Sequence, residues 1–201
     1  MQTQSPYRNV KQHATISIEP YHMNSDIRNN MLIVLKKKVE KKCNAYGYID
    51  TVHNIMTFSD GALVPENLSG NAIYNTTYNC KICLPIENSV IIGLVKVINP
   101  EIIVCINGPI MIFITKDNID NNFWELTDNY YNKQSKNKIE TNQYVKIHIL
   151  NTRINQGDAQ IKAIGRLLDT PTKAEITQFY GSNIPNENNE NTDNTNNSFI
   201  M

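Results

Sequence analysis

The chain has 201 residues, of which 40% are hydrophobic, and its 19 Lys and Arg residues balance its 19 Asp and Glu residues. This length allows one domain or two small ones, and the balanced charge excludes the strong positive excess of a dedicated nucleic-acid binder. No apolar run is long enough to span a membrane and no signal-peptide pattern opens the chain, so we expect an intracellular protein.

Residues 1–84 predict a small α+β unit. Residues 15–19 alternate apolar and polar side chains, as a strand does, until Pro20 ends the pattern. Apolar residues then follow at helical spacing from Ile27 to Val39, behind a helix-start cluster at 24–26. The second half of 43–55 and residues 72–84 have strand patterns. This order indicates one helix packed on an antiparallel sheet.

Residues 85–170 predict a five-stranded OB-fold β-barrel. The strand patterns lie at 89–99, 101–107, 110–115, 144–154 and 159–168, with a polar, irregular insert at 116–143. Glycines inside the first and last of these strands, Gly93 and Gly165, are typical of such barrels. From residue 171 the periodicity is lost, and eight of the last twenty residues are Asn, so we expect 171–201 to be a largely disordered tail.

Two further patterns bear on chemistry. Cys80 and Cys83 have the spacing of half a zinc site, but Cys43 and Cys105 are isolated. Reduced, buried thiols are therefore the preferred interpretation, with a metal site or redox chemistry as alternatives. The chain contains no GxSxG, HExxH or P-loop motif, and its four His residues are scattered singly, so catalysis by this chain alone is not expected.

Several stretches, in this order and spacing, resemble one family, the stalk subunit of multi-subunit RNA polymerases. This family comprises the seventh subunit of eukaryotic RNA polymerase II and its archaeal counterpart. The matching stretches are "ISIEP" with the helix after it, "YGYIDTV" (46–52), the loop between Gly61 and Gly70, "YNCKICLP" (78–85), "GLVKVI" (93–98), "NGPIMIFITKD" (107–117) and "YVKIHILNTRINQGDAQIKAIGRL" (144–167). The resemblance covers roughly residues 14–170, and the Asn-rich composition suits a member from a large DNA virus.

The resemblance implies a non-catalytic subunit without a cofactor, built from a truncated RNP-like domain (1–84) and an OB domain (85–170). The first domain would dock on the largest polymerase subunits near the clamp, and the second would contact nascent single-stranded RNA weakly and without sequence preference. The docking residues implied are Tyr46, Gly47, Tyr48, Ile49, Asp60, Gly61 and Gly70. The residues placed to meet RNA are Lys96, Lys116, Tyr144, Lys146, His148, Arg153 and Lys162.

Ordinary turn glycines, strand aromatics and solvated strand faces would explain the same residues without any binding role. The resemblance also implies a smaller helical partner subunit, which viral members can lack. A viral member would act in the virion and at the cytoplasmic replication site of the host, and a cellular one in the nucleus. The alternative function is a free-standing OB-fold RNA-binding protein, such as a translation or RNA-processing factor.

Overall fold

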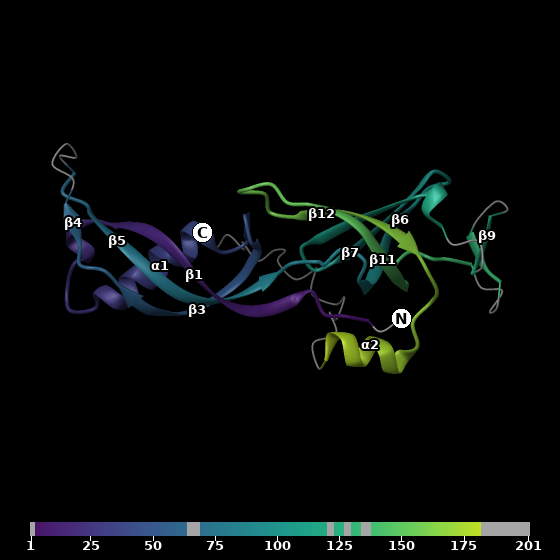
Figure 1. Ribbon diagram of the computed structural model, residues 1–201, viewed down its shortest axis with the longest axis horizontal. Coiled ribbons are helices and arrows are strands. Elements are labelled where there is room, and N and C mark those ends of the chain that lie inside the picture. Colours follow the sequence, from purple (N-terminus) through teal and green to yellow (C-terminus); the bar gives the residue numbers. More distant parts are fainter. Residues whose placement is uncertain (1–2, 64–68, 120–122, 127–129, 134–137, 182–201) are drawn as a thin grey trace, which may run out of the picture.

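The computed structural model describes residues 3–63, 69–119, 123–126, 130–133 and 138–181. Figure 1 shows an elongated molecule in which a twisted sheet with a helix lies beside a barrel. The N-terminal part contains β1 (Tyr7–Ile18), a 3₁₀ turn η1 (Pro20–His22), α1 (Ile27–Val39), β2 (Lys42–Asn44), β3 (Gly47–Phe58), β4 (Ala62–Leu63) and β5 (Ala72–Cys83). Its antiparallel strands lie in the order β1-β5-β3-β2, and β4 pairs with β5.

The two faces of this sheet differ in chemistry. Ile16, Tyr74 and Ile55 point to one face and are buried against Met31 and Leu35 of α1. Strand residues alternate between faces, so the intervening Asn, Thr, His and Lys side chains occupy the other face. No helix among the described residues covers that polar face. The predicted helix at 27–39 is therefore confirmed, and it supplies one side of a small core.

Strand β1 begins eight residues before the predicted strand at 15–19. It pairs with β5 without a break, from Tyr7 opposite Cys83 to Ile18 opposite Ala72. Its first half has only Val10 and Ala14 as apolar residues on the helix side, which left the alternation too weak to recognise in the sequence. The length of β1 is therefore set by its pairing with the long strand β5 and not by a local sequence pattern.

The second part is a closed barrel in the order β11-β12-β8-β7-β6. Its strands are β6 (Val90–Ile98), β7 (Ile102–Asn107), β8 (Ile110–Thr115), β11 (Tyr144–Arg153) and β12 (Ile161–Leu167). Only β12 and β8 run parallel, while the other neighbours are antiparallel. The predicted five-stranded barrel is thus present and OB-like, in a molecule that is mostly β. That the N-terminal part is RNP-like stays a prediction.

The glycines of the barrel make room for one side chain. A Cβ atom added to Gly93 would lie 2.7 Å from Cδ1 of Ile147, and one added to Gly165 would overlap its Cγ2. Ile147 is fully buried in the barrel core. The two glycines therefore let the barrel close around Ile147, which explains their positions in the first and last strands.

The insert at 116–143 is more ordered than expected where it is described. It contains a 3₁₀ turn η2 (Lys116–Asn118) and a two-stranded hairpin, β9 (Trp124–Leu126) with β10 (Tyr130–Asn132). Trp124 and Tyr130 are buried in the barrel cluster. The Trp124 indole N–H donates to the Leu168 carbonyl, and the Tyr130 hydroxyl donates to the Pro100 carbonyl at 2.6 Å. Aromatic residues in a polar segment thus extend the barrel core.

A joint connects the two parts through side chains and main chain. Cys43, Tyr48 and Cys83 belong to the N-terminal sheet but are buried in the barrel cluster. The Cys43 N–H donates to the Asp158 carbonyl, and the Gly157 N–H donates to the Cys43 carbonyl, both at 2.8 Å. The β11–β12 hairpin therefore closes onto β2, and this fixes the orientation of the barrel against the sheet.

A second helix, α2 (Lys173–Tyr180), corrects the expectation of a tail without structure from residue 171. Thr172 and Glu175 form a reciprocal capping box at its start. The Tyr180 hydroxyl donates to the Ile92 carbonyl of β6 at 2.8 Å. In Figure 1, α2 lies beside the barrel, close to the amino terminus of the chain. Residues 182–201 of the predicted tail lie outside the described residues.

Candidate interaction surfaces

The predicted docking residues fall into two groups that the structure separates. Tyr46, Gly47, Tyr48 and Ile49 lie where β3 begins, next to the barrel. The loop from Asp60 to Gly70 follows the other end of β3, and its residues 64–68 lie outside the described part. Eleven residues of extended chain separate Ile49 from Asp60, a span of roughly 35 Å. The two groups therefore lie at opposite ends of β3.

Most of the first group has a structural role. Tyr48 and Ile49 are buried, and Gly47 packs against the Cys83 carbonyl. Only the Tyr46 side chain, which is 68% exposed, is available to a partner. In the stretch "YGYI", the last three residues therefore have structural roles, and only the first, Tyr46, is exposed.

The second group belongs to an exposed apolar end of the molecule, which we call the distal tip. Gly61 packs on the ring of Tyr74, and Gly70 lies next to Pro20. Three exposed side chains that the sequence analysis missed gather around these glycines: Tyr21 (69% exposed), Leu63 (67%) and Phe58 (41%). β4 marks this end in Figure 1, far from the barrel. The apolar residues Phe58 and Leu63, on either side of the Asp60-Gly61 turn, could have indicated this exposed surface from the sequence.

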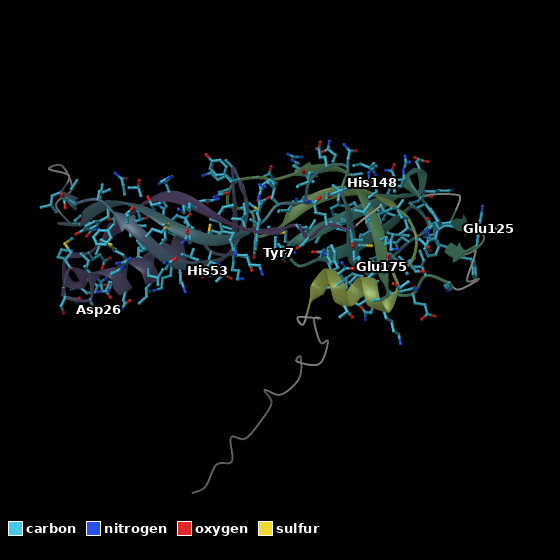
Figure 2. All side chains as sticks on the ribbon, turned by 60° about the horizontal axis from the view of Figure 1, so that its bottom comes forward. Tyr7, Asp26, His53, Glu125, His148 and Glu175 are labelled. Carbon is cyan, nitrogen blue, oxygen red and sulfur yellow. The ribbon has the colours of Figure 1, made fainter. Side chains whose placement is uncertain are left out.

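Three of the seven predicted RNA-binding residues come together on the outside of the β11–β12 hairpin. Arg153 lies opposite Lys162, and His148 lies opposite Arg166. Arg166 was not predicted, although the alternation of Ile161, Ala163, Gly165 and Leu167 into the core places Lys162, Ile164 and Arg166 outside. His148 is labelled in Figure 2, on the barrel half of the molecule.

An aromatic and aliphatic strip continues this basic surface. Ile164, which is 47% exposed, pairs with Phe113 of β8, and Phe113 pairs with Val104 of β7. Phe113 is half-buried and alternates with the core residues Ile112 and Ile114, so it lies outside the barrel. We define the outer barrel face as His148, Arg153, Lys162, Ile164, Arg166 and Phe113. Basic residues around an aromatic ring are the groups that bind single-stranded nucleic acid.

Helix α2 covers two of the other predicted residues. The Lys146 ammonium forms an ion pair with the Glu175 carboxylate at 2.7 Å, and the ring of Tyr144 packs on the ring of Tyr180. The hydrogen bond from Lys146, helped by the Thr172 N–H, lowers the pKa of Glu175 to about 2. Both predicted residues therefore have partners within the chain and do not belong to the outer barrel face.

The last two predicted residues lie apart from this face. Lys96 lies near the end of β6 and donates to the Asn142 side chain at 3.2 Å. Lys116 is exposed at the start of η2. Each is on the barrel surface, but neither pairs with the β11–β12 hairpin.

The geometry of β5 separates the two thiols of the CysxxCys pair. Cys80 is buried in the core beneath α1, whereas Cys83 is buried in the barrel cluster on the other face. Burial raises the pKa of Cys80 to about 11 and that of Cys83 to about 12. The described residues contain no group of three or more His, Cys, Asp or Glu residues that could hold a metal ion. Two neutral thiols on opposite faces of a strand are poor ligands for one ion.

An exposed apolar tip lies at one end of the molecule, and a basic face with an aromatic ring lies on the barrel. Such surfaces are typical of proteins that bind other macromolecules. No helix among the described residues has the length and apolar character needed to cross a membrane.

Comparison with known proteins identifies the family. The chain is 35% identical over 180 residues to the putative DNA-directed RNA polymerase subunit L376 of Acanthamoeba polyphaga mimivirus, covering 89% of this chain and 90% of the relative. It is 23% identical over 144 residues to subunit 7 of DNA-directed RNA polymerase II from Arabidopsis thaliana, covering 70% of this chain and 81% of the relative. No protein-family model matches. The chain belongs to the family of DNA-directed RNA polymerase subunits, and the resemblance predicted from its sequence is confirmed.

Proposed function

We propose that this polymerase subunit is a non-catalytic stalk. Its N-terminal part docks on the largest core subunits near the clamp, and its barrel contacts nascent single-stranded RNA. The observation that carries the docking proposal is the distal tip, where Tyr21, Phe58 and Leu63 are exposed together. Exposed apolar side chains gathered at one place are typical of protein–protein contacts.

The RNA contact is supported by the outer barrel face. Phe113 provides a ring for base stacking, and Lys162 and Arg166 flank it on the neighbouring strand. Strands two and three of an OB barrel, here β7 and β8, are the ones that bind oligonucleotides in many proteins with this fold. The face is small and the chain is neutral, so the contact is weak and depends on salt.

Affinity purification of the tagged protein from its native source tests the docking proposal. The wild-type chain should recover the two largest polymerase subunits, and the variant Tyr21→Ser/Phe58→Ser/Leu63→Ser should lose them. Ile33→Ser is the matched control, because Ile33 is an exposed apolar residue of α1 outside the tip. Recovery by the tip variant would place the docking surface elsewhere. Recovery of ribosomal proteins or RNA without polymerase, by the wild type, would favour a free-standing RNA-binding protein.

A further inference from the structure

A groove that no predicted function uses runs along β1. It has a volume of about 430 Å³ and is lined by Arg8, Val10, Lys11, Gln12, His13, Tyr46 and Ile82. β1 is the end strand of its sheet, and no described strand pairs with its outer side. We call these seven residues the β1 groove.

The outer edge of β1 is open to pairing. The Lys38 ammonium donates to the Thr15 carbonyl at 2.5 Å, so Thr15 directs its main chain away from β5. Because pairing with β5 continues without a bulge, Lys11 and His13 direct their N–H and C=O groups to the same outer side. Natural proteins usually protect long edge strands, and an unprotected one is a site for an added strand.

One buried donor in the groove lacks an acceptor. Gln12 is only 6% exposed, and its Nε2 has no hydrogen-bond partner among the described residues. Its orientation is fixed by neighbours: the Tyr46 N–H donates to Asn44 Oδ1, so Asn44 Nδ2 must donate to Gln12 Oε1 at 2.7 Å. A flipped Gln12 amide would place two donors against each other. A buried donor without an acceptor is costly, and a carbonyl or carboxylate oxygen from an occupant would satisfy it.

The groove therefore favours an extended peptide with negative charge. Arg8 and Lys11 carry donors and positive charge, and none of the described residues that line the groove is acidic. A peptide main chain can pair with the β1 edge, which the sugar–phosphate chain of RNA cannot do. Val10, Tyr46 and Ile82 add an apolar wall for one or two side chains of that peptide.

We propose that residues 182–201 of this chain occupy the β1 groove. This segment contains Glu187, Glu190 and Asp193 but no Lys or Arg, and it ends with Phe-Ile-Met at 199–201. It follows α2 directly. The Tyr180 hydroxyl accepts from Asn107 at 3.2 Å, and the neighbouring Gly108 contacts the Tyr7 hydroxyl where β1 begins. Twenty residues of chain can extend about 66 Å, far beyond the few residues of β1 that form the groove.

Hydrogen exchange on the full-length protein tests this occupancy. The Lys11 and His13 amides should be protected in the wild type and exchange several-fold faster in Glu187→Gln/Glu190→Gln/Asp193→Asn. This variant changes no described residue, so amides of α1 and the barrel are the internal control. Equal exchange at Lys11 and His13 in the two proteins would overturn the proposal. So would protection of these amides that appears only when single-stranded RNA is added.

Zero-length carbodiimide cross-linking gives an independent measurement on the same full-length chain. Lys11 should couple to the carboxylates of 187–193 several-fold more often than Lys162, an exposed lysine of the barrel. Gln12→Glu keeps the acceptor for Asn44 and replaces only the unpaired donor with an anionic oxygen. It should reduce coupling at Lys11 to the level of Lys162. Equal coupling at both lysines in the wild type would overturn the proposal.

Discussion

Two constraints favour glycine at position 47. Its backbone conformation is one that residues with a side chain rarely adopt, and a neighbouring carbonyl leaves no space for a Cβ atom. Its φ is +126°, and a Cβ atom there would lie 2.7 Å from the Cys83 carbonyl oxygen. We expect Gly47→Ala to lower the free energy of unfolding by about 2–4 kcal/mol, from strain plus steric overlap. Urea unfolding measures this loss.

Gly157 supplies the matched control for Gly47. It also has a positive φ, +88°, but no atom of the described part of the chain lies within 4 Å of an added Cβ. Gly157→Ala should therefore cost only the backbone strain, about 1–2 kcal/mol. Equal losses for the two variants would show that the Cys83 contact adds nothing. A stable Gly47→Ala protein that no longer recovers polymerase would instead assign Gly47 a direct role in docking.

Substitutions of Phe113 and Lys162 separate the contributions of base stacking and of charge to the proposed RNA contact. Phe113→Ala should weaken binding to a single-stranded oligonucleotide by about 1–3 kcal/mol, the cost of losing one stacked base. Lys162→Gln should reduce the slope of log K against log salt by about 0.7, the value for one phosphate contact on a single strand. Fluorescence anisotropy at several salt concentrations measures both. Lys173→Gln, on α2, is the control and should leave the slope unchanged.

At the scale of elements, one of the contacts that attach α2 to the barrel is an ion pair, and its strength depends on pH. The Lys146 ammonium lowers the pKa of Glu175 from 4.5 to about 2. A depressed pKa contributes stability above the unfolded pKa, and this contribution is lost as the pH falls through 4.5 towards 2. Protection factors of the α2 amides should therefore fall over this range, modestly because water screens the exposed carboxylate. Glu175→Gln should have slightly lower protection than the wild type at pH 7 and little further change in acid.

The elements show which features of the fold a sequence can predict. α1 and the barrel strands were predictable because their apolar residues recur at helix or strand spacing. α2 was missed although Thr172 and Glu175 form a capping-box pattern, because an Asn-rich composition dominated the interpretation of the segment. The first half of β1 had no clear local pattern, since its helix side carries the polar residue Gln12 between Val10 and Ala14. Its pairing with β5 joins segments that lie far apart in the chain, so a local sequence pattern cannot predict it.

The candidate sites divide in the same way. Lys162 and Arg153 were predictable as outward residues because strand alternation assigns them a face. The ion pair between Lys146 and Glu175 was not predictable, because it depends on where α2 packs. The separation of Tyr46 from Asp60 follows from the length of β3, which the sequence left undefined between 43 and 58. Contacts between distant segments, rather than residue types, decide which side chains remain available.

At the scale of the whole molecule, the joint connects the barrel core to the N-terminal sheet. Cys43, Tyr48 and Cys83 of the N-terminal sheet complete the barrel cluster, so the barrel core is not whole without the N-terminal part. Hydrogen bonds from the β11–β12 hairpin to Cys43 add to this dependence. The proposed stalk role would require such a fixed connection between the distal tip and the barrel.

This coupling predicts that both parts unfold together. Trp124, the single tryptophan, is buried in the barrel cluster and reports its unfolding by fluorescence, while α1 and the sheet contribute to far-UV circular dichroism. In the wild type the two curves should coincide in urea. Tyr48→Ala removes a large side chain from the barrel cluster at a cost of about 3–5 kcal/mol. The curves should then separate, with Trp124 fluorescence changing first, because the core beneath α1 does not contain Tyr48. Ile16→Val, which removes one methylene beneath α1 at a cost of about 1 kcal/mol, should shift both curves together. Separate curves in the wild type would mean that the joint orients the two parts without coupling their stability.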